Sequence, residues 1–231
     1  MTRPQAPATR RPREERIADI MAAASEEFRI SGFEGASMAS IARRANVVEG
    51  SIYRFFTHKH DLLTKVVEQW YEDMLADYAR QLSCIAGTRN RLRYMIWRHL
   101  KTIHDDPEMC RLMFDHVRSA PDYRDTAVFR LNRLYTLRTL EIVQEAMAAG
   151  RVRQDLDLTM VRDFIYGGVE HRSWAYLRSE GTIDPDATAD AIVDLVLHGL
   201  CARPEEAAED LPIDRLEALA TRLEAAVNGL G

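Results

Sequence analysis

Apolar residues recur along this chain with the spacing of α-helices, and no segment shows the alternation of a half-buried strand. Between residues 17 and 28 they lie at i, i+3, i+4, i+7 and i+11, which is one face of a helix. The chain has 231 residues, enough to bury a sizeable core. The sequence therefore predicts an all-α fold, with a head of three short N-terminal helices followed by a C-terminal bundle of about six to seven helices.

Prolines, glycines and charge divide the chain into parts. The expected parts are a flexible arm at 1–12, the head at 13–60, the bundle at 61–203 and a C-terminal helical extension at 204–231 with a last helix at 212–229. Within the larger parts, Gly32 is expected to end the first helix. Pro107 is expected to open a short helix and Pro121 a long one.

Charge is distributed unevenly between the two ends. The net charge is −5, but residues 1–60 hold ten Lys or Arg against seven Asp or Glu, a net of +3, which leaves −8 for the rest. A basic N-terminal quarter on an acidic protein is compatible with a nucleic-acid partner there. An excess of +3 is too small to establish one by itself.

Several classes of protein lack support in the sequence. No run of 18 uncharged apolar residues could span a membrane, and the N-terminus lacks the apolar core of a secretory signal. Cys84, Cys110 and Cys201 lack metal-ligand spacing and suit a reducing cytoplasm, where we expect the protein to reside. The histidines form no recognisable metal set, and there is no phosphate loop or nucleophile elbow. We therefore expect no enzyme activity, no metal and no cofactor.

The stretch SMASIARRANVVEGSIYRFFTHKHDLL, residues 37–63, carries the most specific pattern. Ser37 can cap a short helix, and Asn46 tolerates the left-handed backbone of a tight turn. A second short helix, from about Glu49 to Phe55, completes a helix-turn-helix, whose second helix enters the major groove of DNA. Gly50 weakens that helix by roughly 1 kcal/mol relative to alanine. In return, a backbone without a Cβ can approach a phosphate closely.

The same stretch resembles the DNA-binding region of tetracycline-repressor-type (TetR) regulators. The matching positions are Ile41, Ala42, Ala45, Val47, Gly50, Tyr53, Phe56, Lys59 and Leu62, while Ser37, Ser51 and Ile52 are of the favoured types. The resemblance implies a dimeric repressor that binds a double-stranded DNA operator through its first three helices. It also implies that the remaining helices bind an effector and form the dimer.

Nine residues of this region are expected to face DNA: Ser37, Arg43, Arg44, Glu49, Gly50, Ser51, Tyr53, Arg54 and Lys59. Arg54 is the best base reader, because a guanidinium can pair bidentately with guanine, and Lys59 supplies a charge for a phosphate. A half-buried Tyr53 and a merely solvated Arg54 remain open alternatives. Val48 departs from the family's Ser or Thr and removes a helix cap and a phosphate donor.

The bundle is expected to contain the dimer interface and an apolar pocket. Helices at 157–179 and 185–201 from two protomers would form a four-helix interface. Aromatic and methionine side chains between the helices could line the pocket or simply form core: Trp70, Met74, Tyr78, Trp97, Met109, Met113, Phe114, Tyr135, Phe164 and Trp174.

Two segments also resemble the branch of these repressors that responds to long-chain fatty acyl-CoA: VVEGSIYRFFTHKHDLL and FIYGGVEHRSWAYL. Such an effector needs an apolar tunnel and cations for its phosphates. Arg89, Arg91, Arg93 and Arg98 could supply these cations, or could form a solvated basic face. The sequence thus favours a ligand-responsive repressor. The alternative is a DNA-binding protein without a small-molecule switch, controlled by protein partners or acting architecturally.

Overall fold

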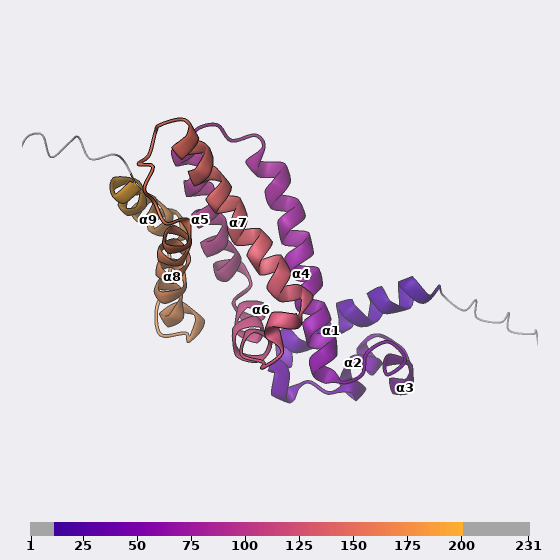
Figure 1. Ribbon diagram of the computed structural model, residues 1–231. Helices are drawn as coiled ribbons and strands as arrows, with labels where there is room; N and C mark the ends of the chain where they lie inside the picture. The colour runs from indigo at the N-terminus through magenta and orange to yellow at the C-terminus, as the bar shows by residue number, and fades with distance from the viewer. Residues whose placement is uncertain (1–11, 201–231) are drawn as a thin grey trace, which may run out of the picture.

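The computed structural model describes residues 12–200, and every regular element in that range is helical (Figure 1). The elements are α1 (Arg13–Gly35), α2 (Met38–Arg44), α3 (Glu49–Ile52), α4 (Lys59–Leu82), α5 (Thr88–Asp105), α6 (Pro107–Leu112), the π-helical turn η1 (Met113–Arg118), the 3₁₀ turn η2 (Tyr123–Asp125), α7 (Ala127–Ala148), α8 (Leu158–Leu177) and α9 (Pro185–Leu200). The predicted all-α fold is confirmed. The arm through residue 11 and the expected helix at 212–229 lie outside the described residues.

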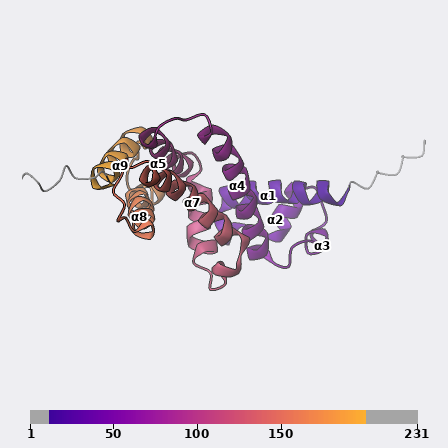
Figure 2. The same cartoon turned by 45° about the horizontal axis from the view of Figure 1, so that its top comes forward.

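The first three helices form the head, at the opposite end of the molecule from α8 and α9 (Figure 2). Ile20 and Phe28 of α1, Ile41 of α2 and Ile52 of α3 are fully buried in its core. A helix of one turn such as α3 is unstable alone, so this packing holds it in place. From the head, α4 runs into the bundle (Figure 1).

A glycine breaks α1 near its end. Gly32 has φ +65° and ψ 177°, a conformation that is essentially restricted to glycine, and the helix resumes for one turn to Gly35. Gly32 therefore interrupts the helix where the sequence predicts its end. The break redirects the chain so that Phe33 lies against His60 and His116, from α4 and η1.

Helix α5 is the centre of the bundle and packs against α6, α7, α8 and α9. Its residues Leu92, Met95, Ile96 and Leu100 are buried almost completely. Side-chain caps begin the surrounding helices. One example is Asp157, whose carboxylate accepts hydrogen bonds from the N–H groups that start α8.

Two helix boundaries differ from the sequence-based expectations. Pro121 does not open the long helix; it lies in a turn before η2, and α7 begins after Thr126, whose Oγ1 accepts a hydrogen bond from the Phe129 N–H at 3.2 Å. A local side-chain cap thus decides the start of α7. The short helix after Pro107 passes into the π-helical turn η1.

We expect Gly32→Ala to lower the free energy of unfolding by about 1–3 kcal/mol, because alanine is strained at this backbone conformation even though a Cβ would meet no neighbour within 4 Å. Chemical denaturation measures this change. Gly35→Ala is the matched control: its Cβ would make only an ordinary 3.4 Å contact with Ser31. Equal stability of the two variants would contradict the prediction.

Candidate nucleic-acid interface and ligand pocket

Local hydrogen bonds build the turn between α2 and α3. Ser37 and Ser40 form a reciprocal capping box, with N–H to Oγ distances of 3.0 and 3.1 Å. Asn46 adopts the predicted left-handed conformation, with φ +53°. The next amide, of Val47, donates to the carbonyl of Ala42 at 2.9 Å. The result is a helix-turn-helix whose second helix is presented on the outside of the head.

Four of the nine predicted DNA-facing side chains are exposed and uncommitted. The side chains of Arg43, Glu49, Tyr53 and Arg54 make no hydrogen bond or ion pair with the rest of residues 12–200. Tyr53 is 51% exposed, so about half of its surface is accessible and half is covered. Ser51 lies beside them and is partly exposed. These groups are free to interact with another molecule.

Arg44 is instead bound inside the head. Its guanidinium forms ion pairs with Glu26 at 2.9 Å and with Glu27 at 3.0 Å. Glu27 is a buried carboxylate, and hydrogen bonds from Ser40 and Arg44 hold its pKa below the usual value. The main contribution of Arg44 in this structure is therefore to satisfy Glu27.

Lys59 has a similar structural role. Its Nζ donates to the carbonyl oxygens of Phe33 and Ala36, at 2.6 and 3.0 Å, and lies 4.3 Å from the centre of the Phe33 ring. The ammonium thus satisfies carbonyl groups at the end of α1. Ser37 is likewise occupied as a cap. The predicted set therefore separates into free side chains and side chains that shape the head.

Neither the backbone conformation nor the packing of the described chain requires a glycine at position 50. Its φ is not positive, and a Cβ placed there would meet no atom within 4 Å. The fold would accept alanine at this position. Open space beside the backbone of α3 fits the close approach of an external group, as the sequence suggests.

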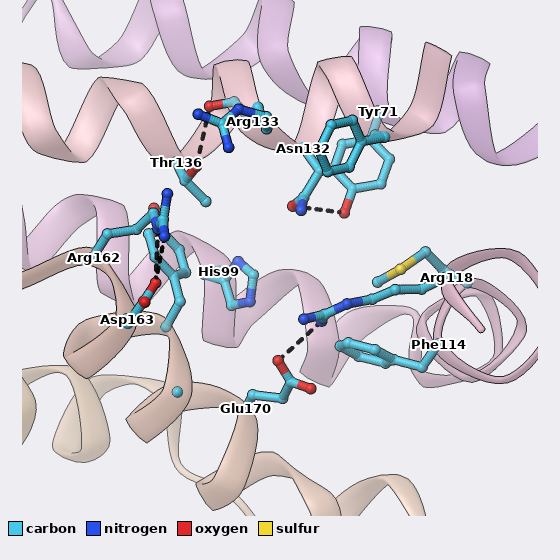
Figure 3. A pocket seen from close by; sticks show the side chains of 14 residues that line it. Tyr71, His99, Phe114, Arg118, Asn132, Arg133, Thr136, Arg162, Asp163 and Glu170 are labelled. Atoms are coloured by element: carbon cyan, nitrogen blue, oxygen red, sulfur yellow. Dashed lines mark hydrogen bonds and ion pairs between the residues drawn. The ribbon is translucent and has the colours of Figure 1, made fainter. Parts of the chain in front are cut away.

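A pocket of about 400 Å³ lies in the bundle between α4, α5, η1, α7 and α8 (Figure 3). Its lining consists of Tyr71, His99, Met113, Phe114, Arg118, Phe129, Asn132, Arg133, Thr136, Arg162, Asp163, Tyr166, Gly167 and Glu170. The lining of the cavity therefore contains both apolar or aromatic side chains and charged side chains.

The charged groups of the pocket are arranged around its mouth and one end. Arg118 pairs with Glu170 at 3.0 Å and its guanidinium lies 5.5 Å from the centre of the Phe114 ring (Figure 3). Arg133 lies 6.0 Å over the Phe129 ring. These cations are close to apolar surface, so the pocket can accept an anion attached to an apolar group.

A neutral histidine closes the inner side. The His99 Nδ1 is 3.0 Å from the hydroxyl of Tyr135, which lies fully buried behind it. Burial, aided by the charge of Arg118, lowers the pKa of His99 to about 4. His99 therefore contributes a hydrogen-bonding group without a charge near neutral pH.

The structure brings only part of the predicted ligand set to this pocket. Met113 and Phe114 line it directly, and Tyr135 and Trp174 lie behind His99 and Phe114. The other six predicted residues lie elsewhere: Trp70 and Met74 at a groove between α4 and α5, Tyr78 beside a groove between α4 and α7, Met109 in the core, Trp97 half-buried with its indole N–H unpaired, and Phe164 exposed on α8.

The sequence analysis missed Tyr71, His99 and the pocket arginines. The sequence analysis expected Trp70 of α4 to line the pocket, whereas the next residue, Tyr71, lines it. The expected inward face of α4 was therefore displaced by one residue. The arginines were missed because the expected pocket was assigned from aromatic and methionine side chains alone. Polar side chains at inward positions of an otherwise apolar helix are the sign that could have found them.

The basic cluster on α5 is neutralised. Acidic partners occupy each of its arginines: Arg89 pairs with Asp194, Arg91 with Glu145, Arg93 with Asp186 and Asp190, and Arg98 with Asp77. These pairs tie α5 to α4, α7 and α9. The cluster is therefore neither a solvated basic face nor a free phosphate site, which corrects both expectations.

The π-helical turn η1 connects the pocket with the head. Phe114 and Arg118 face the pocket. Between them, His116 accepts a hydrogen bond at its carbonyl from the His60 Nε2 at 2.8 Å, and its ring lies 4.5 Å from that of Phe33. This six-residue turn therefore contacts both the pocket and the two residues, Phe33 of α1 and His60 of α4, that lie next to the head.

Two family models match the chain. One, described as bacterial regulatory proteins of the tetR family, matches residues 20–66, and the other, described as the tetracyclin repressor-like C-terminal domain, matches residues 86–200. Together they span the helix-turn-helix and most of the bundle. The chain belongs to the TetR family. The family thereby confirms the prediction that the protein is a DNA-binding transcriptional regulator and not an enzyme.

Relatives of this TetR regulator cover between about half and four fifths of its length. The fatty acid metabolism regulator protein of Bacillus subtilis (strain 168) is 20% identical over 181 residues, 78% of this chain and 93% of that protein. The HTH-type transcriptional activator FasR of Mycolicibacterium smegmatis is 31% identical over 107 residues, 46% of this chain and 49% of FasR. The crystal structure of the Bacillus subtilis regulator FadR in complex with stearoyl-CoA superposes with a TM-score of 0.70 at 20% identity, covering 79% of this chain and 98% of FadR.

Two classes of site are absent from the described part of the regulator. Among residues 12–200 no three metal-ligating side chains gather. No helix within that range is long and apolar enough to cross a membrane.

We expect Gly50→Ala to separate stability from DNA binding. The free energy of unfolding should stay unchanged or rise by up to about 1 kcal/mol, since alanine favours the helix. Operator affinity should fall by roughly tenfold or more, the value of a lost hydrogen bond to a charged phosphate. Denaturation and fluorescence anisotropy measure the two effects. With Gly181→Ala as a distant control, an unchanged operator affinity for Gly50→Ala would disprove the close approach.

Proposed function

We propose that this TetR regulator is a repressor that is released from its operator by an amphipathic, anionic effector, acting as a homodimer in the bacterial cytoplasm. The observation that carries the proposal is the connection through η1: one face lines the pocket, and the opposite face is bonded to the head. A ligand that displaces η1 would also move the contacts of His60 and Phe33. The open pocket favours this function over a regulator without a small-molecule switch.

On the DNA side, the free residues of the head have distinct proposed roles. Arg54 is the proposed base reader, because it is exposed and has no partner within the described chain. Arg43, Ser51, Tyr53 and the backbone at Gly50 are the proposed backbone contacts, which position the head without reading sequence. The proposed role of Arg44 and Lys59 is to stabilise the head itself, through their bonds to Glu27 and to the end of α1.

On the effector side, a long-chain acyl-CoA is the first candidate. Phe114, Phe129 and Met113 offer apolar surface for an acyl chain, and Arg133, which has no ion-pair partner among residues 12–200, offers a cation for a phosphate or carboxylate group. Arg118 and Arg162 are paired with Glu170 and Asp163, so an anionic ligand would have to displace these carboxylates to bind them. The stearoyl-CoA in the FadR complex is of this chemical class.

The proposed dimer interface is formed by α8 and α9. Met160 and Phe164 on α8 and Leu195 on α9 are 66, 62 and 67% exposed, an unusual set of apolar groups on one end of the molecule. Gly168 lies on the outer part of α8, where a Cβ would meet nothing within 4 Å. Glycine there destabilises the helix, but it permits a second helix to approach closely.

The effector switch is tested by calorimetry of stearoyl-CoA with and without operator. We expect operator to weaken stearoyl-CoA binding, and stearoyl-CoA to weaken operator binding by the same factor, between about 5- and 150-fold for typical couplings. Arg133→Gln should weaken stearoyl-CoA binding. Arg130→Gln, on the same helix but outside the pocket lining, is the control. Equal affinities in the two titrations would exclude stearoyl-CoA as the inducer.

The dimer is tested by sedimentation. We expect Phe164→Glu to convert a micromolar solution from dimer to monomer, because burial of an unpaired carboxylate at the interface is unfavourable by several kcal/mol. Leu137→Glu, at an exposed apolar residue on α7, should remain dimeric. A dimeric Phe164→Glu protein would show that the interface lies elsewhere.

A further inference from the structure

Val48 is the most exposed large apolar side chain in the part of the chain that the structure describes. It is 78% exposed, compared with 66% for Ile30 on α1 and 67% for Leu195 on α9. It immediately precedes α3, within the helix-turn-helix. The neighbouring Val47 is packed against the core of the head, so two consecutive valines have opposite environments.

Valine is also an unfavourable residue for the local backbone. Val48 is the N-cap of α3, with φ −74° and ψ 136°, and it provides no side-chain hydrogen bond to the helix. Serine, threonine, aspartate or asparagine would satisfy a free N–H there, and apolar residues forgo that stabilisation. Neither helix capping nor packing within the described chain accounts for valine at this position.

The surroundings of Val48 are those of the proposed DNA-facing surface. Glu49, Tyr53 and Arg54 are exposed on the same short element, and Gly50 leaves open space beside it. The side chain of Val48 is β-branched and therefore stiff, and Asn46 and Val47 fix the backbone before it. Val48 thus presents a rigid apolar surface at the entrance of the second helix.

The chemistry of the major groove restricts what such a surface can recognise. Of the four bases, only thymine presents a methyl group there, at its C5 position. An apolar side chain that cannot form a hydrogen bond gains most from contact with this methyl group. We propose that Val48 contacts the C5-methyl group of one thymine in each half-site and so selects thymine at that position. The inference rests on the proposed entry of α3 into the major groove.

The test removes one methyl group at a time. Selection from random duplexes first defines the preferred operator. Each thymine of that operator is then replaced by deoxyuridine, which lacks the C5-methyl group but keeps all hydrogen-bonding groups. We expect one symmetry-related position where wild-type affinity falls by roughly fourfold per half-site, the value of one buried methyl group. At the other thymines the affinity should change little.

Variants of the full-length chain then test whether the side chain of Val48 causes this preference for thymine. Val48→Ser should bind thymine and deoxyuridine operators equally at that position, while its capping hydroxyl keeps or improves the stability of the head. Val48→Ala should show the same loss of discrimination. Ile30→Ala, at the exposed apolar residue of α1, should discriminate as the wild type does.

Two results would overturn the inference. One is a wild-type protein whose affinity is insensitive to the methyl group at every thymine; the other is a Val48→Ser protein that keeps the wild-type preference. If the selection recovers no preferred sequence, the proposed function, binding to a specific operator, is itself contradicted. A selected operator together with methyl-independent binding would leave operator binding intact and reject only the role of Val48.

Discussion

The contact between Lys59, Phe33 and His116 joins the three elements on which the rest of the regulator depends. Lys59 bonds to two carbonyls at the end of α1 and lies over Phe33, while Phe33 packs against the His116 ring of η1. Gly32 makes this arrangement possible, because its backbone redirects α1. This cluster of aromatic and cationic groups, together with the Arg29–Asp106 ion pair, holds the head against the bundle.

The sequence predicted the elements well because most of them are specified locally. Ser37, Asn46 and the apolar spacing of α1 act within a few residues, so capping and turn chemistry sufficed to predict the head. The boundary near Pro121 was wrong for a similar reason: Thr126 provides a stronger start signal than the proline does. The π-helical turn η1 has no comparable local signature, and its conformation depends on tertiary contacts.

The site was less predictable, because it depends on pairs that are distant in sequence. Arg44 and Glu27 are 17 positions apart, and Arg93 and Asp190 are 97 apart. Without the fold, an arginine that is neutralised by a partner cannot be distinguished from one that is free. Helix periodicity likewise placed the aromatic residues of α4 near the bundle, but could not tell whether Trp70 or Tyr71 faces the cavity.

The independence of the exposed side chains in and beside α3 has an evolutionary consequence. The side chains of Val48, Glu49, Tyr53 and Arg54 form no hydrogen bond or ion pair with the rest of the described chain, so replacing them leaves the core and caps of the head intact. Most substitutions in a protein are limited by a threshold of stability. Divergence at these four positions escapes that limit, so a duplicated copy of this gene could acquire a new operator while its pocket and its dimer remain those of the parent.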